Sequence, residues 1–456
     1  MTNRRPRRIL RVVETPSTAH TRAPGPPHPG PAPYTPSGWR ALPPAARGLI
    51  GARFIRSVAQ GALVVDFLLY LRALGWTATA IGGLLTAIGV AGAAIVLVSG
   101  VGSDRIGRRP VLLFYQIAMV AGTIAVLAHP ATWVLTAVAV TLGFGRGANG
   151  SAGPFGPAEQ AWLAQSVPAS QRGRVFSLNQ AVTSWGMGCG ALLGAALVHG
   201  PTATAYRPLF VLALGVAVIN TVQIARLREP PRLRAIPSPD PQDGIPKPPS
   251  PRTASPADPE RHRENRALSL LAGVNAVNAL GVGLFGPLLP YWLSVRYGVG
   301  PGAIGPVFGF TFLLTGLSAI AAGEAAARHG LVRTVVWIRL LGVLLLAALP
   351  LMPSFGWAAV LYVARAVLNR GSNGARQAFG AGLVRDERRG FAASLNGLSM
   401  RLPSALGPAV AGRLLALGAV DLPLFLGAGL QLAYVALFAG LMGRYEPTRD
   451  LAADEL

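Results

Sequence analysis

Two short segments place arginine and asparagine beside glycine within apolar runs. Residues 146–150 read RGANG and residues 370–374 read RGSNG, and each follows a tryptophan by thirteen positions. A planar guanidinium binds carboxylate or phosphate through paired hydrogen bonds. The candidate ligands for an anion are therefore Arg146 and Arg370, with Arg365 and Arg401 nearby in sequence. Asn149 and Asn373 are candidates for the same substrate cavity, on a face that is either close-packed or lined by ligand.

Asp66 is the one acidic residue deep inside an apolar segment. A carboxylate at such a position is costly and marks a candidate functional site. Burial favours the neutral carboxyl group and a nearby arginine favours the charged form, so proton occupancy could depend on conformation. Two readings stay open. Asp66 either binds and releases a coupling proton, or forms a static ion pair with an arginine such as Arg146 or Arg56.

The elements that must position these residues are membrane helices. Apolar residues make up 51% of the 456-residue chain and charged residues 13%, whereas soluble domains carry about 25% charged residues. Apolar segments of about 20 residues, each long enough to cross a bilayer, recur along the chain. The predicted fold class is an all-α membrane protein embedded in the lipid bilayer. Twelve transmembrane helices are predicted, at residues 50–72, 79–101, 110–128, 132–154, 175–198, 207–226, 268–293, 303–325, 334–352, 355–378, 391–416 and 422–443.

Positive charge is distributed unevenly among the loops. Arg72, Arg207 and Arg296 are the only basic residues in one set of alternate loops, whereas the tails, the central segment and the other loops hold most of the 41 lysines and arginines. Basic loops stay on the cytoplasmic side. We therefore expect a multi-pass protein of the inner (plasma) membrane with both termini in the cytoplasm. The net charge of +23 then reflects topology rather than nucleic-acid binding.

The second half of the chain repeats patterns of the first. Besides the two arginine segments, AIG at 80–82 recurs at 303–305 and SLN at 177–179 recurs at 394–396, in the same order. Two six-helix repeats are a transporter architecture. The predicted parts are a disordered basic cytoplasmic tail (1–47), a six-helix half (48–226), a proline-rich cytoplasmic linker (227–266), a second six-helix half (267–445) and a short cytoplasmic tail (446–456).

A charged loop lies between the second and third predicted helices. It reads SGVGSDRIGRRP over residues 99–110. This stretch resembles the motif G-x-x-x-D-R-x-G-R-R of the major facilitator superfamily, and over residues 48–445 the chain is similar to twelve-helix drug or metabolite:proton antiporters. The resemblance implies two pseudo-symmetric six-helix halves and transport by alternating access. The matching residues are Gly100, Asp104, Arg105, Gly107, Arg108 and Arg109.

The resemblance also implies a gating role for this loop. In the family, the motif aspartate meets the N-terminus of the eleventh helix when the cytoplasmic side is closed. A carboxylate near a helix N-terminus is stabilised by about 0.3–1 kcal/mol. Here the contact would join Asp104 to the helix start near Gly390, and the motif arginines would meet Glu159 at the inner end of the fourth helix. Otherwise the arginines only hold the loop inside.

Glycines at a spacing of four mark one face of the fifth predicted helix, and such a face lets another helix approach closely. In the family the fifth helix packs against the eighth, where the two halves meet. Plain packing explains the glycines equally well. These residues are Gly186, Gly190 and Gly194, with Gly407 as a counterpart in the second half.

The resemblance adds a further reading of Arg146. Proton antiporters carry R-x-x-Q-G in the fourth helix, and its arginine tunes the coupling acid; here Asn149 stands for the glutamine. Three readings stay open. Arg146 acts in proton coupling, Arg146 and Arg370 form an anion site, or each arginine caps helix carbonyls exposed by the glycines. Asn179 and its repeat Asn396 are further candidates for the substrate cavity, or packing residues.

Other function classes lack their residues. The only lysine, Lys247, lies in the linker, so the ATP-binding Gly-Lys-Ser/Thr loop is missing. A single cysteine and histidines outside the helix centres provide no metal site, cofactor site or enzyme active site. The sequence predicts a monomeric secondary transporter that exports a small organic molecule or drug, coupled to protons. The alternatives are a carrier of an organic or inorganic anion bound by Arg146 and Arg370, and a sensor that does not transport.

Overall fold

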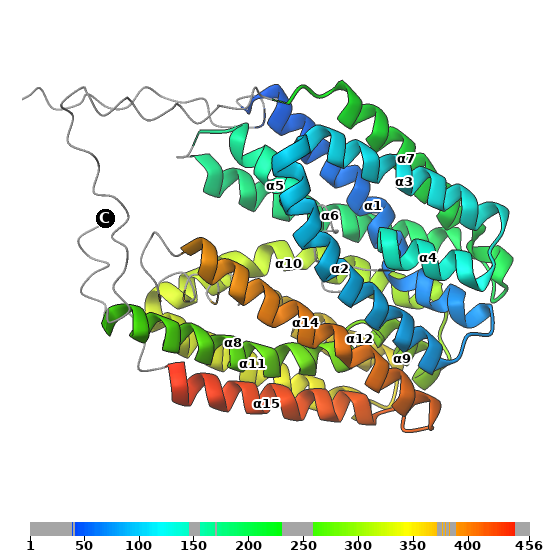
Figure 1. Ribbon diagram of the computed structural model, residues 1–456. Helices are drawn as coiled ribbons and strands as arrows, with labels where there is room; N and C mark the ends of the chain where they lie inside the picture. The colour runs from blue at the N-terminus through cyan, green and yellow to red at the C-terminus, as the bar shows by residue number, and fades with distance from the viewer. Residues whose placement is uncertain are drawn as a thin grey trace, which may run out of the picture. The chain divides into compact units, whose positions relative to one another are not determined.

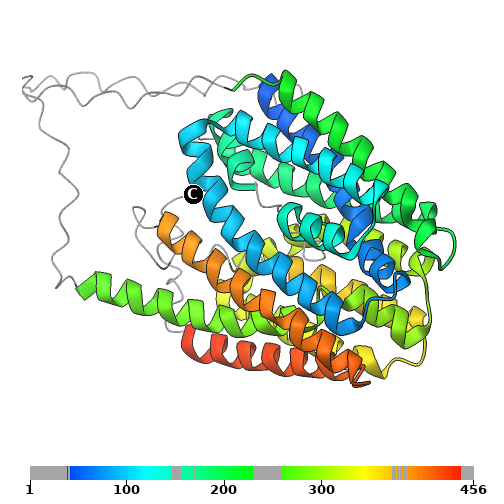
Figure 2. The ribbon, with the colours of Figure 1, turned by 45° about the vertical axis from the view of Figure 1, so that its right-hand side comes forward.

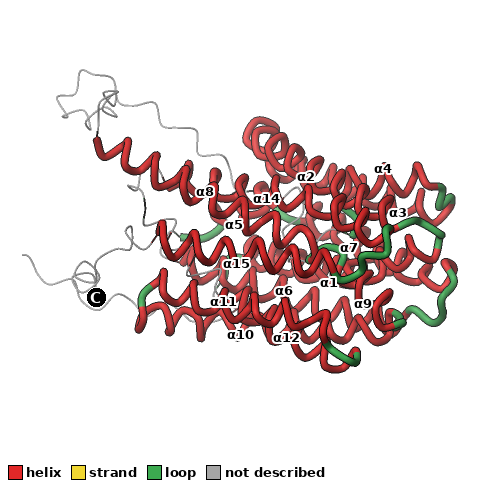
Figure 3. Tube along the Cα trace, turned by 90° about the horizontal axis from the view of Figure 1, so that it is seen from below, coloured by secondary structure: helices red, strands yellow, loops and turns green. Residues whose placement is uncertain are grey.

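The computed structural model describes residues 39, 42–145, 156–168, 171–229, 259–371, 376, 379, 383 and 389–442. The chain divides into Met1–Leu42 and a second unit, Pro43–Leu456. The described elements of the second unit are all helices (Figure 3).

The first half comprises α1 (Pro44–Ala73), α2 (Ala78–Ile106), α3 (Arg108–Ala128), α4 (Thr132–Leu142), α5 (Gly156–Gln165), α6 (Arg172–Leu197), η3 (Ala203–Tyr206) and α7 (Arg207–Arg226). The second half comprises α8 (Pro259–Phe285), α9 (Leu289–Tyr297), α10 (Pro301–His329), α11 (Leu331–Ala348), η4 (Leu349–Leu351), α12 (Phe355–Gly371), α14 (Arg389–Ala416) and α15 (Leu422–Met442).

The described helices follow the predicted membrane spans. Seven of them are long and apolar enough to cross a membrane, and two shorter segments, Thr132–Leu142 and Pro301–Thr315, are also apolar. Each of the twelve predicted spans coincides with one of these helices or with another described helix. Two spans differ from the prediction because their helices are interrupted.

The fourth predicted helix, at 132–154, does not continue as expected. α4 ends at Leu142, and Gly143 takes a left-handed conformation with φ of 82°. Gly145 also has a positive φ, 71°. Glycine adopts these angles without the steric cost that a Cβ would impose, so the helix stops here. α5, which was not predicted, begins at Gly156.

The seventh predicted helix, at 268–293, is divided in two. α8 ends at Phe285 and α9 begins at Leu289. Pro287 lies in the interruption. Proline has no backbone N–H to donate, and its ring clashes with the carbonyl of the preceding helical turn, so a continuous helix is unfavourable here. Pro290 stands in the first turn of α9, where proline is tolerated.

Glycines bring helices of the same half into close contact. A Cβ on Gly190 of α6 would overlap the backbone carbonyl of Val58 in α1, and one on Gly186 would lie 2.7 Å from the carbonyl of Phe54. Gly194 likewise faces α1. The prediction that this glycine face meets the eighth predicted helix is therefore wrong, since its partner is the first. In the second half, Gly407 of α14 faces α8 in the equivalent way.

Two other helix pairs join the halves, and Figures 1 and 2 show both. α6 meets α10 through a different face, where a Cβ on Gly188 would lie 2.8 Å from Leu313. α2 runs beside α14, and Gly82 lies against the backbone of Pro408 while Gly412 lies against Ala78. Because glycine has no side chain at these positions, the two helices of each pair approach each other closely.

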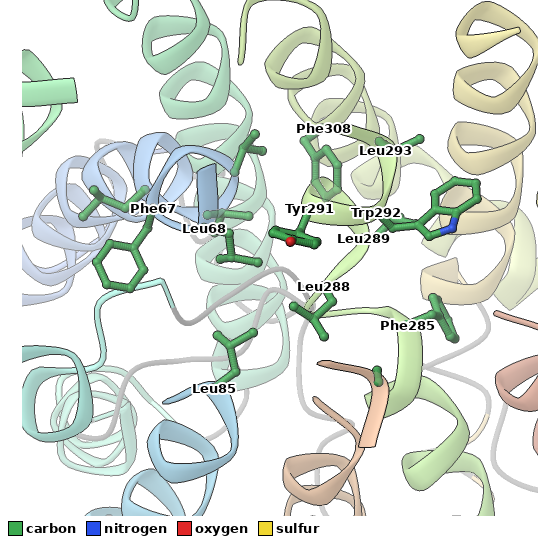
Figure 4. Packing of buried hydrophobic residues seen from close by; sticks show 14 of the residues in the cluster. Phe67, Leu68, Leu85, Phe285, Leu288, Leu289, Tyr291, Trp292, Leu293 and Phe308 are labelled. Atoms are coloured by element: carbon green, nitrogen blue, oxygen red, sulfur yellow. The ribbon is translucent and has the colours of Figure 1, made fainter. Parts of the chain in front are cut away.

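Buried apolar side chains fill the space where α1, α2, α9 and α10 meet. Figure 4 shows Phe67 and Leu68 of α1 and Leu85 of α2 on one side, with Tyr291 of α9 and Phe308 of α10 on the other. Phe67 and Phe308 are each at most 1% exposed. This packing connects the first half to the interrupted helix α8–α9 of the second.

Candidate functional site

A cavity of about 390 Å³ lies between the two halves. Its walls come from α2 and Gly145 on one side and from α8, α9, α11, α12 and α14 on the other. Sites for small molecules typically have volumes of about 300–1,000 Å³. The cavity can therefore hold a small organic molecule.

Arginine dominates the charge of this cavity. Its described lining residues include no aspartate and no glutamate. Cations grouped inside a protein are costly unless an anion compensates them. The cavity therefore favours a negatively charged ligand. The charged lining residues are Arg339, Arg365, Arg370, Arg376 and Arg401.

Arg365 is held in place from two directions. Its side chain is 6% exposed, and its guanidinium lies over the ring of Phe285 of α8 at 4.4 Å from the ring centroid. One Nη2–H donates to Oε1 of Gln431 in α15, at 3.1 Å. The Nε–H has no hydrogen-bond partner among the described residues. A rigid guanidinium with a free donor is suited to binding an anion.

Arg370 and Arg376 extend this arrangement. The guanidinium of Arg370 lies over the ring of Phe312 of α10, 4.5 Å from its centroid. Arg376 is 9% exposed and donates from Nη1 to the sulfur of Met400 at 3.6 Å. Thioether sulfur is a weak acceptor, so an anionic oxygen would be a far better partner for this arginine.

The sequence analysis identified part of this cluster. It proposed Arg370, with Arg365 and Arg401 nearby, and all three line the cavity. It missed Arg339 and Arg376, although both lie inside predicted spans, where a charged side chain is a signal of function.

The asparagine candidates are distributed differently. Asn179 and Asn396 are not among the described lining residues. Asn179 is buried in α6, where its backbone carbonyl accepts a hydrogen bond from Thr183, and Oδ1 of Asn396 accepts one from Asn275 at 2.7 Å. The described contacts therefore favour a packing role for Asn179 and Asn396 over a role in the substrate cavity. Arg146, Asn149 and Asn373 lie outside the described residues.

Asp66 lies apart from the cavity, in the contact between α1 and α6. It is fully buried, and neither carboxyl oxygen has a hydrogen-bond partner among the described residues. A Cβ on Gly194 would collide with Oδ2 of Asp66. The suggested ion pair with Arg56 is wrong, because Arg56 binds Glu159 instead. Among the described residues, an ionised carboxylate here would have no hydrogen-bond partner, which is costly.

Comparison with known proteins identifies the family of this chain. The family model described as "Major Facilitator Superfamily" matches residues 49–268 and 271–455. The chain belongs to the major facilitator superfamily. Two curated proteins match more locally. Inositol transporter 4 of Arabidopsis thaliana is 28% identical over 157 residues, or 34% of this chain and 25% of that protein. Multidrug resistance protein MdtH of Cronobacter sakazakii is 34% identical over 153 residues, or 33% and 32%. The matched region therefore spans at most about a third of these relatives.

Solved structures of the superfamily share the fold. The nucleoside transporter NupG superimposes with a TM-score of 0.66 at 12% identity, covering 87% of this chain and 99% of NupG. The D-xylose–proton symporter gives 0.63 at 11% identity, covering 86% and 95%. The human organic anion transporter MFSD10 gives 0.55 at 18% identity, covering 87% and 100%. The protein thus has the superfamily fold of two pseudo-symmetric helical halves, and its relatives are membrane transporters rather than enzymes.

The superfamily motif at 100–109 forms the turn from α2 to α3. Gly107 has φ of 120°, which joins the two helices directly. The backbone N–H groups of Arg108 and Arg109 each donate to the carboxylate of Glu229 at 3.0 Å. A carboxylate, that of Glu229, thus stabilises the N-terminus of α3. The predicted contact of Asp104 with the helix start near Gly390 stays a prediction. The surroundings of Gly100 and the side chain of Asp104 lie outside the described part, and Arg105 is exposed.

Glu159 is not the partner expected for the motif arginines. It is buried on α5 and forms ion pairs with two arginines of α1, Arg56 and, at 3.8 Å, Arg53. Arg108 instead donates from Nη1 to the backbone carbonyl of Ala161 in α5, at 2.9 Å. The predicted pairing is therefore wrong, although the motif does contact α5.

Polar contacts also join the halves near the C-terminal ends of α1 and α9. Arg72 donates from Nη1 to Oγ of Ser294 at 2.7 Å, and its guanidinium lies 5.7 Å from the ring centroid of Tyr291. Within the second half, Trp292 donates from Nε1 to Oδ1 of Asp421 at 3.1 Å. These bonds hold α9 in position against α1 and against Asp421, which directly precedes α15.

Proposed function

We propose that this superfamily member is a secondary transporter that binds a small organic or inorganic anion in the arginine-lined cavity. The observation that carries the proposal is the set of five arginines facing one cavity whose described lining contains no acid. Electrostatic complementarity then selects the sign of the substrate's charge. This was the alternative reading of the sequence, and the arginines lining the cavity favour it.

Alternating access explains how the anion would cross the membrane. The described contacts between the halves include Gly82 against Pro408, Gly412 against Ala78, and Arg72 with Ser294. All of these lie toward the end of the helices that the charge distribution assigns to the outside. The described state is therefore consistent with a carrier closed outside, whose cavity exchanges with the cytoplasm.

Asp66 is the best candidate for binding a coupling proton. The neutral carboxyl group suits its apolar contact with Gly194, whereas the ionised form would need a partner or water. Tyr206 is a described titratable group that interacts electrostatically with Asp66. Because Asp66 lies between α1 and α6 and away from the cavity, it would act on the packing of these helices, and the substrate would not contact it.

Proton-coupled export of a drug is the second candidate, because the local identity with MdtH favours it. A cationic drug fits the cavity poorly, since five arginines would repel it. Under either function, we propose that the protein lies in the inner (plasma) membrane as a monomer. Both termini and the linker at 227–266 are then in the cytoplasm.

A charge series of ligands tests the proposal. Purified full-length protein is heated with phenyl phosphate, phenol or tetraethylammonium, which are anionic, neutral and cationic. A ligand that binds only the folded state raises the melting temperature, and its stabilising free energy grows as RT ln(1 + [L]/Kd). We expect stabilisation by phenyl phosphate alone. Stabilisation by tetraethylammonium without stabilisation by the anion would favour the drug-export reading and contradict the anion site.

A further inference from the structure

Among the described lining residues, the polar groups lie on one side of the cavity. Its arginines, with Asn278, Tyr362 and Asn369, all belong to the second half. We call the five arginines the cationic wall. Facing it, α2 contributes only apolar residues and glycine to the described lining. This apolar wall consists of Leu85, Ile88, Gly89, Gly92 and Ala93.

The cationic wall contains buried donors that lack acceptors. The Nε–H groups of Arg365 and Arg376 have no hydrogen-bond partner among the described residues, and the two side chains are 6% and 9% exposed. Leaving such a donor unsatisfied is unfavourable. Two separate guanidiniums with free donors fit a head group with several acceptor oxygens and two negative charges.

The size of the cavity argues against a bare inorganic ion. At about 30 Å³ per water molecule, a volume of about 390 Å³ equals roughly 13 waters. An inorganic phosphate bound at the cationic wall would leave most of this volume filled with water against the apolar wall. A ligand that also covers Ile88 and Ala93 would remove that apolar surface from water, which is favourable.

We propose that the substrate is an amphipathic organic anion. Its doubly charged head group binds the cationic wall, and its apolar body lies against α2. The inference rests on the proposed function and adds the substrate class to it: a phosphate monoester or a dicarboxylate that carries an aromatic or aliphatic group. The cationic wall thus selects ligands by their negative charge, and the apolar wall on α2 selects ligands that carry an apolar group.

Calorimetric titration of the full-length protein with phenyl phosphate and with inorganic phosphate tests the inference. We expect phenyl phosphate to bind at least tenfold more tightly. Arg365→Gln should weaken both ligands to a similar extent. Ala93→Asn should reduce the preference for phenyl phosphate to below threefold while leaving the affinity for inorganic phosphate unchanged. Ala94→Asn is the matched control, because Ala94 is the exposed neighbour on α2 and does not line the cavity.

The outcomes separate the two proposals. Equal affinities for the two ligands, or a tenfold preference that persists in Ala93→Asn, would overturn the amphipathic substrate and leave the anion transporter standing. Absence of binding by both anions, or binding that Arg365→Gln does not alter, would overturn the proposed function itself. If Ala93→Asn does not fold, Ile88→Thr makes the same comparison on the same wall.

Discussion

Replacing Arg365 by glutamine should weaken anion binding without destabilising the empty protein. Arg365 is almost fully buried, lines the cavity, and carries a free Nε–H donor. Its positive charge is therefore useful only when an anion is present. The substitution removes that charge and keeps a side chain that can donate a hydrogen bond.

The two effects can be estimated from the contacts. A hydrogen bond to a charged group contributes about 1.5–3 kcal/mol, and 1.4 kcal/mol is tenfold in Kd. We therefore expect Kd for phenyl phosphate to rise by roughly 10- to 100-fold. Loss of the contact with Phe285 costs about 2 kcal/mol and loss of the bond to Gln431 about 1 kcal/mol. Relief from burying an uncompensated charge offsets this by several kcal/mol.

Titration calorimetry gives Kd, and thermal unfolding without ligand gives the stability. Arg413→Gln is the control, because Arg413 is an exposed arginine of α14 that does not line the cavity. Arg365→Lys should fall between wild type and Arg365→Gln, since lysine keeps the charge but loses the planar fork. A Kd within threefold of wild type in Arg365→Gln would refute the reasoning, and so would an equal loss in Arg413→Gln.

The remaining predictions concern coupling, packing and topology. Asp66→Asn should abolish accumulation driven by a pH gradient while leaving downhill exchange; an unchanged pH dependence removes Asp66 from the coupling mechanism. Gly190→Ala should destabilise the protein by about 1–3 kcal/mol through overpacking, whereas Gly215→Ala, where a Cβ meets nothing within 4 Å, should not; equal effects in thermal unfolding would argue against the close helix contact. Reporter fusions after Arg234 and Leu456 should both report a cytoplasmic location, and an outside signal at either contradicts the topology.

The sequence was sufficient to predict the fold because its signals are local. A span of about 20 apolar residues, the basic loops and the motif at 100–109 each depend on one short segment. The helix interruptions had local signals too, in Gly143 with Gly145 and in Pro287. The predicted spans passed over them because hydropathy measures apolar length and is insensitive to backbone angles.

The candidate site was only partly predictable because it depends on which helices face each other. The repeat placed Arg370 deep in its helix, but only the packing of α11 and α12 brings Arg339 and Arg365 into the same cavity. A spacing of four predicted a close-packed face on α6 but could not name α1 as its partner. In the same way, the sequence shows that Glu159 is acidic but does not show which arginines pair with it. Its partners are Arg53 and Arg56 of α1, and not the motif arginines.

Counterflow in proteoliposomes tests the central claim most directly. Vesicles loaded with unlabelled phenyl phosphate are placed in a trace of labelled phenyl phosphate, and a carrier then accumulates the label transiently by exchange. The anion transporter predicts saturable accumulation with wild-type protein and with Arg413→Gln, and a loss of at least tenfold with Arg365→Gln. Accumulation of labelled tetraethylammonium in the matching experiment, with none of phenyl phosphate, would contradict it.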